Sequence, residues 1–456
     1  MKLLKFRYFA WGVGLVLTIM GYIIVTKTSL NKLFEERIRS RNNYPPFNNE
    51  VKIDSTNLPV IYINTGRIKR NDFINATVRI IDNGVVDYEG EMAIRYRGHA
   101  TFNSAAKKSY ALRPLDENGN KVNVSLLGMK KNKKYALKAN WIDQSMIREA
   151  IAYELAKSTE VETPQQRFCE VVLNDVYYGV YSLMEQPTRK MVGIKKMKED
   201  ISGGYLLYFS RLKESDFIVD YVSNGDSIRY PFIVKYPDAE VLTPAHKAYL
   251  EQQIIKMNDA VRDTISTSYN DYIDVLSFID YQLSSEFVCN TDAYWGSGYL
   301  YKDIDDIDGR FRMCLWDGDH SFGMGHSYKY SWYNHWIYEF NYESSLDHYY
   351  DWWNLLMKNQ NYRSSVIKRW MELRQSSYSN EEIAHTIDSL CFLLTEKGAM
   401  SRNNQAWNIW DEKKGNNINH HHVKYQSDSF EDEIQYIKNW IKFRLEWMDE
   451  KLNFND

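Results

Sequence analysis

The spacing of apolar residues changes once along the chain, and this change limits the folds that the chain can adopt. Up to Ser210 the apolar residues come in short alternating or β-branched runs, and after Pro244 they recur at helical spacing. Strands are predicted over 58–64, 75–81, 91–97, 109–113 and 203–210, and long helices over 272–288, 364–375 and 431–452. We therefore expect an α+β protein whose first part is β-rich and whose later part is mostly helical.

Two local patterns stand out in the first half. Residues 143–158 have apolar side chains at helical spacing, and Asp143 is the expected N-cap of this helix. Residues 170–185 predict two strands around an Asn-Asp turn. Because no long Gly/Ser linker follows residue 58, we expect 58–456 to fold as one unit.

The N-terminus carries a candidate membrane anchor. Residues 8–25 contain no charged side chain and are long enough to cross a bilayer, and Lys2, Lys5 and Arg7 precede them. A cleaved signal peptide is the alternative, but no run of small residues follows the apolar segment. We expect 1–25 to be a cytoplasmic stub and transmembrane helix, 26–57 a stalk, and the main domain to lie on the extracytoplasmic side.

Charge and cysteine usage exclude some classes of protein. The formal net charge is -3, so nucleic acid is not an expected partner. The four cysteines form no C-x-x-C pair and are expected as small buried hydrophobic residues, although export would permit a disulfide. The histidines at 420–422 lie in a polar stretch that predicts a solvated loop.

Two acidic segments carry the candidate chemistry. Asp292 follows a predicted helix, and Asp317 and Asp319 follow a predicted strand over 311–315. In a hairpin, Asp292 and Asp317 would meet at one end. Such a pair suits phosphoryl transfer, in which one carboxylate acts on the acceptor hydroxyl and another holds Mg²⁺. Spacing alone is more typical of two ordinary acidic turns, because Asp-Gly turns are common in loops.

Four sequence blocks resemble the CotH kinase-like family. They are IRYRGHATFNSAAKKSY at 94–110, the segment 137–156, LNDVYYGVYSLME at 173–185, and NTD at 290–292 with WDGDHSFG at 316–323. The resemblance implies a two-lobed, atypical protein-kinase-like fold, with a β-rich N-terminal lobe and a mostly helical C-terminal lobe. It also implies transfer of phosphate from ATP to protein hydroxyls, with Mg²⁺ or Mn²⁺, on a protein substrate such as a Ser-rich surface protein.

The resemblance points to seven site residues. Asp292 matches the family's catalytic carboxylate, Asp317 its metal-binding one with Asp319 nearby, and Ser297 stands where a metal-binding Asn is expected. Lys108 is the candidate phosphate contact; Glu154, which is not one of the seven, is a possible ion-pair partner of Lys108. Arg97 and Glu185 also occupy family positions, as further cofactor-binding residues or as residues that hold the lobes together.

Two other functions remain open. A catalytically weak or inactive surface-binding module is compatible with Ser297 and with the aromatic residues of 328–353, which would then stack on a glycan or a partner; these are Trp332, Trp336, Tyr349, Trp352 and Trp353. Aromatic residues also fill cores, so the same segment is compatible with packing alone. A metal-dependent hydrolase would use the same carboxylates.

Overall fold

The computed structural model describes residues 47–98, 102–103, 105–196, 201–223, 225–324, 331–340, 350–410 and 427–453. The predicted anchor at 1–25, the first part of the predicted stalk, Tyr349 and the histidines at 420–422 lie outside these residues. No helix within these ranges has both the length and the apolar character of a membrane span. Phe47 packs on Trp407 with a ring-centroid distance of 4.6 Å, so the packed part of the chain begins before residue 58.

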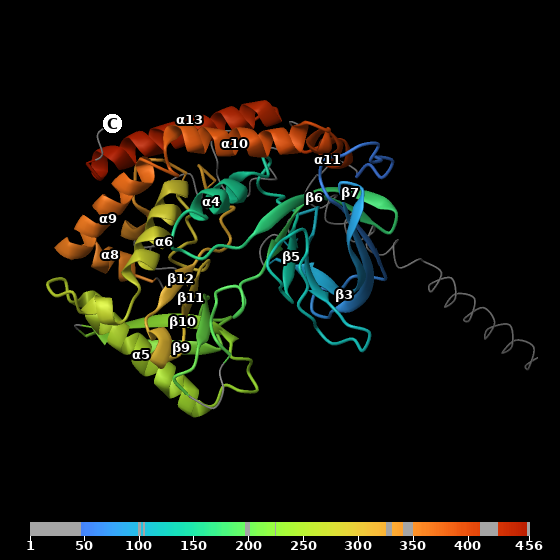
Figure 1. The fold of residues 1–456 in the computed structure, drawn as a ribbon. Helices are drawn as coiled ribbons and strands as arrows, with labels where there is room; N and C mark the ends of the chain where they lie inside the picture. Colours follow the sequence, from blue (N-terminus) through green and yellow to red (C-terminus); the bar gives the residue numbers. More distant parts are fainter. Residues whose placement is uncertain are drawn as a thin grey trace, which may run out of the picture.

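The first half of the chain forms a closed seven-stranded barrel (Figure 1). Its strands are β1 Val60–Thr65, β2 Ile74–Asp82, β3 Val85–Arg97, β4 Ser109–Pro114, β5 Tyr135–Lys138, β6 Gln166–Leu173 and β7 Val176–Glu185. The order around the barrel is β1-β2-β3-β4-β5-β7-β6, and a parallel pairing of β1 with β6 closes it. The predicted β-rich first part is confirmed.

The turn residues explain two of the hairpins in the barrel. Asn83 and Gly84 between β2 and β3 both have positive φ, as do Asn174 and Asp175 between β6 and β7. Two consecutive residues with positive φ match the right-handed twist of the flanking strands. The predicted Asn-Asp turn within 170–185 is therefore confirmed.

A second sheet of five strands lies beside the barrel. Its strands are β8 Tyr205–Phe209, β9 Phe217–Ser223, β10 Asp226–Tyr236, β11 Tyr299–Lys302 and β12 Arg312–Cys314, in the order β12-β11-β8-β10-β9. The β9–β10 hairpin was not predicted. The β11–β12 hairpin connects the two acidic segments, as expected from the strand between them.

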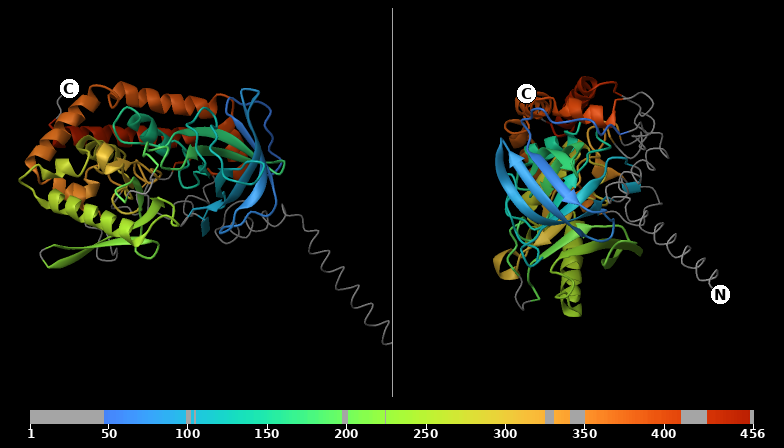
Figure 2. Two further views of the ribbon diagram at one scale, coloured as in Figure 1. Left: turned by 60° about the horizontal axis from the view of Figure 1, so that its bottom comes forward. Right: turned by 90° about the vertical axis from the view of Figure 1, so that its right-hand side faces the viewer.

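Helices fill most of the remaining chain, and the α+β class is confirmed. They are α4 Arg148–Ala156, α5 Pro244–Arg262, α6 Val275–Val288, α7 Asp305–Asp308, α8 Trp352–Leu356, α9 Gln360–Arg374, α10 Asn380–Thr395, α11 Ala399–Trp407 and α13 Phe430–Lys451. In Figures 1 and 2, α10 and α13 run along one side of the molecule, and α11 reaches the barrel. There Arg402 of α11 forms a buried ion pair with Glu170 of β6, at 2.9 Å.

Helix α4 begins later than predicted, at Arg148. Asp143 is not its N-cap: that position is Ile147. The Asp143 carboxylate instead accepts hydrogen bonds from the Ser145 amide at 3.0 Å, the Arg148 amide at 2.9 Å and Arg148 Nη1 at 2.8 Å. The residues before Arg148 are therefore held in a turn by a buried carboxylate.

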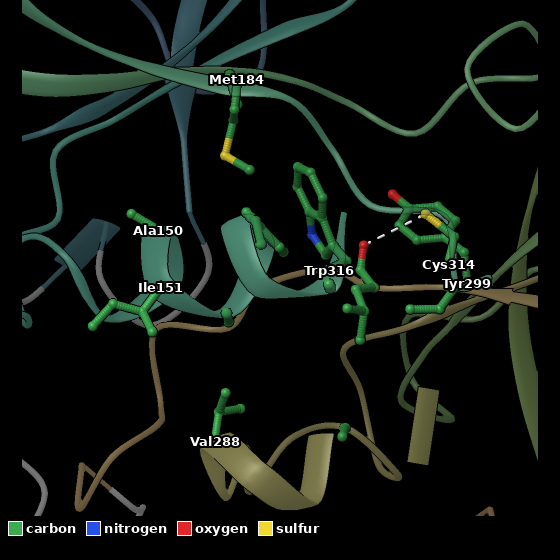
Figure 3. Packing of buried hydrophobic residues seen from close by; sticks show 14 of the residues in the cluster. Ala150, Ile151, Met184, Val288, Tyr299, Cys314 and Trp316 are labelled. Carbon is green, nitrogen blue, oxygen red and sulfur yellow. Dashed lines mark hydrogen bonds between the residues drawn. The ribbon is translucent and has the colours of Figure 1, made fainter. Parts of the chain in front are cut away.

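The core passes continuously from the barrel to the helices. Figure 3 shows Trp316 among buried residues of α4, β7 and β11, including Ala150, Met184 and Tyr299. Trp352 and Trp353 are also fully buried, so they are core residues, as the packing alternative expects, and cannot form part of a glycan- or partner-binding surface. All four cysteines lie in the described part of the chain and are free; Cys391 is half-buried and the other three are buried.

Candidate active site

A cavity of about 190 Å³ lies between the barrel and the second sheet. Six of the seven predicted site residues line it: Arg97, Lys108, Asp292, Ser297, Asp317 and Asp319. Arg97 and Lys108 come from the barrel side, whereas the aspartates and Ser297 come from the loops that flank β11 and β12. The predicted meeting of Asp292 and Asp317 at one end of this hairpin is therefore seen in the structure.

Lys138, the last residue of β5, is the centre of the charge network in this cavity. Its ammonium lies 2.8 Å from Glu149 Oε2 of α4, 2.8 Å from Asp317 Oδ1 and 3.6 Å from Asp319 Oδ2. Burial alone would lower the pKa of Lys138, but Asp317, Asp319 and Glu149 together raise it. Lys138 is thus a fixed cation that links a barrel strand, a helix and the acidic loop.

Helix α4 also positions the backbone around Asp317. The Asp317 amide donates to Tyr153 Oη at 3.0 Å, and the Gly318 amide donates to Glu149 Oε1 at 3.1 Å. Tyr153 Oη in turn donates to Glu149 Oε1 at 2.9 Å. Asp317 has a φ of 58°, a left-handed conformation that few residues other than glycine adopt. Two side chains one helical turn apart therefore hold an unusual loop conformation.

The loop that carries Asp292 is a compact turn joined to the Asp317 loop. The amides of Trp295, Gly296 and Ser297 donate to the Asp292 carbonyl at 3.0 to 3.1 Å. Asn290 Nδ2 donates to the Asp317 carbonyl at 3.4 Å, and the Thr291 amide donates to the His320 carbonyl at 3.4 Å. The two acidic loops are therefore positioned by each other.

The electrostatic environment keeps Asp317 ionised. Burial would raise the pKa of Asp317, but the nearby Lys138 and Arg97 outweigh this effect and lower the pKa below its usual value. Tyr208, which donates to the Gly296 carbonyl at 2.7 Å, has a raised pKa because of burial and because of Asp317 and Asp292. The negative charges of both aspartates thus raise the pKa of the same hydroxyl, that of Tyr208 in the cavity wall.

The donor set suits a hard divalent cation. Asp317 and Asp319 present oxygen atoms to the same cavity, and Ser297 lines it as well. In the ranges that the structure describes, three or more His, Cys, Asp or Glu side chains nowhere gather closely enough to form a complete metal cage. Mg²⁺ is usually held by one or two carboxylates and completes its shell with water and phosphate oxygens, so these residues fit such an ion.

Three predicted contacts have other positions or partners. Lys108 lines the cavity, but its ammonium donates to the carbonyls of Phe102 at 2.6 Å and Ala105 at 2.5 Å. Glu185, at the end of β7, is outside the cavity lining and accepts a hydrogen bond from the Gln165 amide at 3.4 Å. The expected pair between Glu154 and Lys108 is wrong, because Glu154 pairs with Lys157 of its own helix at 2.6 Å.

A strand lysine paired with a helix glutamate, facing aspartates on two loops, is similar to the set of residues with which protein kinases bind a nucleoside triphosphate and a metal ion.

The chain belongs to the CotH family, since the family model described as CotH kinase protein matches residues 94–448. Membership suggests a kinase-like function, with use of ATP and a divalent metal in general. A comparison with curated proteins finds no significant match.

Sequence reasoning missed Lys138 and Glu149. Their signal was present: Tyr135-Ala136-Leu137-Lys138 resembles the V-A-I-K strand of protein kinases, whose lysine pairs with a helix glutamate. Helix α4 begins ten residues after this strand ends, since β5 ends at Lys138 and α4 begins at Arg148. A search for the strand motif would have selected Lys138 rather than Lys108.

Proposed function

We propose that this protein is a protein kinase that transfers the γ-phosphate of ATP to hydroxyl groups of a protein substrate in the presence of Mg²⁺ or Mn²⁺. The observation that carries the proposal is the Lys138 ammonium, which joins Glu149 to Asp317 at 2.8 Å each. In kinases this lysine contacts the nucleotide phosphates and its glutamate fixes the lysine in place. The buried position of Lys138 supports the same roles here.

The remaining roles follow from the side of the cavity on which each residue lies. Asp317 and Asp319 would hold the metal ion, which neutralises charge on the phosphates when bound. Asp292 would orient the acceptor hydroxyl and take its proton, while the bond between the γ-phosphorus and the bridging oxygen breaks and ADP leaves. Arg97 would face the phosphates from the barrel, and its guanidinium rests 5.5 Å from the Trp316 ring centroid.

Lys108 and Glu185 then have supporting roles. Lys108 would fix the turn after β3 through the two carbonyls it contacts, so Lys138 replaces it as the proposed phosphate ligand. Glu185 ends the last barrel strand before the chain crosses to the second sheet, where it would support the connection between two kinase-like lobes. We also propose that residues 8–25 anchor this domain on the extracytoplasmic side of a membrane.

A direct test uses the full chain, purified in mild detergent, with labelled ATP, Mg²⁺ or Mn²⁺, and a Ser-rich acceptor protein. We expect label on the acceptor or on the chain itself, and we expect Asp292→Asn to abolish it. Asp306→Asn is the matched control, because Asp306 is an exposed aspartate of the short helix α7. Labelling that survives Asp292→Asn, or no labelling together with no ATP binding, would contradict the proposal.

ATP binding without transfer would instead favour a catalytically weak binding module. Ser297 is the residue that supports this alternative, since it lines the cavity where a carboxamide ligand is expected. A hydroxyl is a weaker Mg²⁺ ligand than a carboxamide oxygen. Restored transfer in Ser297→Asn would then assign the loss to this single position.

A further inference from the structure

A second cavity, of about 370 Å³, lies beside the active site, and among the described residues the two cavities have no lining residue in common. Six basic residues line this second cavity: Lys133, Lys134, Arg189, Lys190, Lys196 and Lys235. Among the lining residues of the described chain, only Asp238 is acidic. We call this space the basic cavity. Such a concentration of positive charge is unexpected in a chain whose net charge is -3.

The basic cavity lies between the barrel and the second sheet. Lys134 directly precedes β5, and Lys235 belongs to β10. The Lys235 ammonium is 5.3 Å from the ring centroid of Tyr208, and Tyr208 lines the active-site cavity. The contact between Lys235 and Tyr208 therefore makes the two cavities neighbours.

Positive charge continues from the basic cavity onto the barrel. Arg95 of β3 and Arg113 of β4 both rest on the ring of Phe73, at 4.9 and 4.1 Å from its centroid. Arg95 Nε is buried and has no hydrogen-bond partner in the structure. Over the described ranges, no carboxylate forms an ion pair with Arg95, Arg113, Lys134 or Lys235.

This arrangement is unfavourable unless an anion is bound. Burial lowers the pKa of Lys134 to about 8, and repulsion from Arg113, Lys133 and Lys235 contributes to the shift. Burial likewise lowers the pKa of Lys235, and Arg95 contributes to this shift while Asp216 opposes it. Asp238 similarly opposes the shift of Lys134. Two carboxylates do not balance the six basic residues of the cavity, and desolvation and like-charge repulsion both oppose half-buried ammonium groups. An anion in the cavity would remove both penalties.

We propose that the basic cavity binds a phosphate group, with Lys134 and Lys235 as its principal contacts. A phosphate offers several acceptor oxygens and up to two negative charges, which suits two converging ammonium groups with further cations around them. The group could be carried by a small soluble phosphate compound or by a phosphoserine side chain. The proposal does not rest on the proposed kinase activity, because none of its contacts belongs to the active-site cavity.

The first experiment is calorimetric titration of the full chain with pyrophosphate, and separately with a phosphoserine peptide, in buffer that contains EDTA. We expect at least one probe to bind, and Lys134→Met and Lys235→Met each to weaken binding at least tenfold. Lys138→Met should leave binding unchanged, as should the control Lys131→Met, because Lys131 is exposed and outside the cavity lining. The tighter probe identifies the carrier of the phosphate group.

Two outcomes would overturn the proposal. One is that neither probe binds; the other is that binding is lost in Lys138→Met but kept in Lys134→Met, which would assign the anion to the active site. These binding measurements do not depend on whether the protein is a kinase, because they are made without metal and involve no phosphate transfer. Thermal unfolding of each variant in the absence of probe separates lost binding from lost folding.

Proton uptake provides a second readout that a purely structural lysine would not affect. The pKa of Lys134 is lowered to about 8, so part of the Lys134 population is uncharged at pH 8, and a bound phosphate favours its protonation. Titration at pH 8 in buffers of different ionisation enthalpy should therefore show more proton uptake by the wild type than by Lys134→Arg, which keeps the charge and the binding. Equal uptake by the two proteins would contradict the assignment of Lys134.

Discussion

Replacement of Lys138 by methionine is the sharpest test of the charge network. The Lys138 side chain is 8% exposed and its partner Glu149 is 4% exposed, so the substitution leaves a buried carboxylate without its cation. Breaking a buried pair from one side typically destabilises a protein by about 3 to 5 kcal/mol. We expect the lower end, about 3 kcal/mol, because Asp317 is 35% exposed and regains contact with water.

A double-mutant cycle separates the buried pair from general damage. Glu149→Gln should cost about 1 to 2 kcal/mol, because the amide oxygen still accepts from Tyr153 and Gly318. The double variant should cost less than the sum of the two single variants by about 2 kcal/mol or more, since it removes both charges. The free energy of unfolding would be measured by urea titration of the full chain.

The control for this cycle is Lys157→Met at the C-cap of the same helix. It removes the exposed pair between Lys157 and Glu154 and should change the free energy of unfolding by less than about 0.5 kcal/mol. The reasoning is refuted if Lys138→Met is as stable as the wild type, or if the losses of the two single variants simply add.

Three further predictions concern other parts of the structure. Gly179→Ala should destabilise the protein by more than about 2 kcal/mol in urea unfolding, because a Cβ would lie 2.3 Å from Asn403 Oδ1 at a φ of +94°. The control Gly119→Ala, at a φ of +79° in open space, should cost about 1 kcal/mol or less. Arg402→Met should cost about 3 kcal/mol, because it leaves the fully buried Glu170 unpaired, and a loss below 1 kcal/mol would contradict this. Burial raises the pKa of Glu286 from 4.5 to about 7. Because the folded state then binds the proton more tightly than the unfolded state, the free energy of unfolding should fall by roughly 3 kcal/mol as the pH rises from about 4.5 to 7. Glu286→Gln should reduce this pH dependence, as measured by thermal unfolding.

Local features of the barrel could be predicted because they depend on neighbouring residues. Asn174 and Asp175 adopt left-handed conformations easily, so the turn between β6 and β7 is determined by the turn residues themselves. The α4 boundary could not be predicted in this way. Asp143 is a good N-cap by residue type, but its carboxylate bonds to Arg148, which also pairs with Glu433 of α13 at 2.6 Å. A partner far along the chain overrides the local preference.

The aspartates of the site could be predicted from the sequence, whereas the lysine that pairs with them, Lys138, was not predicted. Asp292 and Asp317 flank one hairpin, so their proximity follows from a local turn and strand. Lys108 and Lys138 both lie near the ends of barrel strands, and only the position of β5 between β4 and β7 directs Lys138 toward the acids. Spacing alone does not show which of the two lysines faces a loop nearly 180 residues away, whereas the strand motif at 135–138 favours Lys138.

Sequence spacing also did not identify which glutamate of α4 pairs with the lysine of the active site. Glu149 and Glu154 are five residues apart, which is a rotation of about 140° around the helix. Glu149 therefore faces Lys138, while Glu154 faces solvent and pairs with Lys157. The face of α4 that is buried is set by its packing against α6 and the core around Trp316 (Figure 3).

In the proposed active site, Asp317 and Lys138 bind a metal–nucleotide complex together. Calorimetric titration of ATP into the full chain, with and without Mg²⁺, measures this binding. We predict binding that requires Mg²⁺ and that falls at least tenfold in both Asp317→Asn and Lys138→Met. Equal affinity in the wild type and both variants, or equal affinity with and without the metal, would contradict the claim.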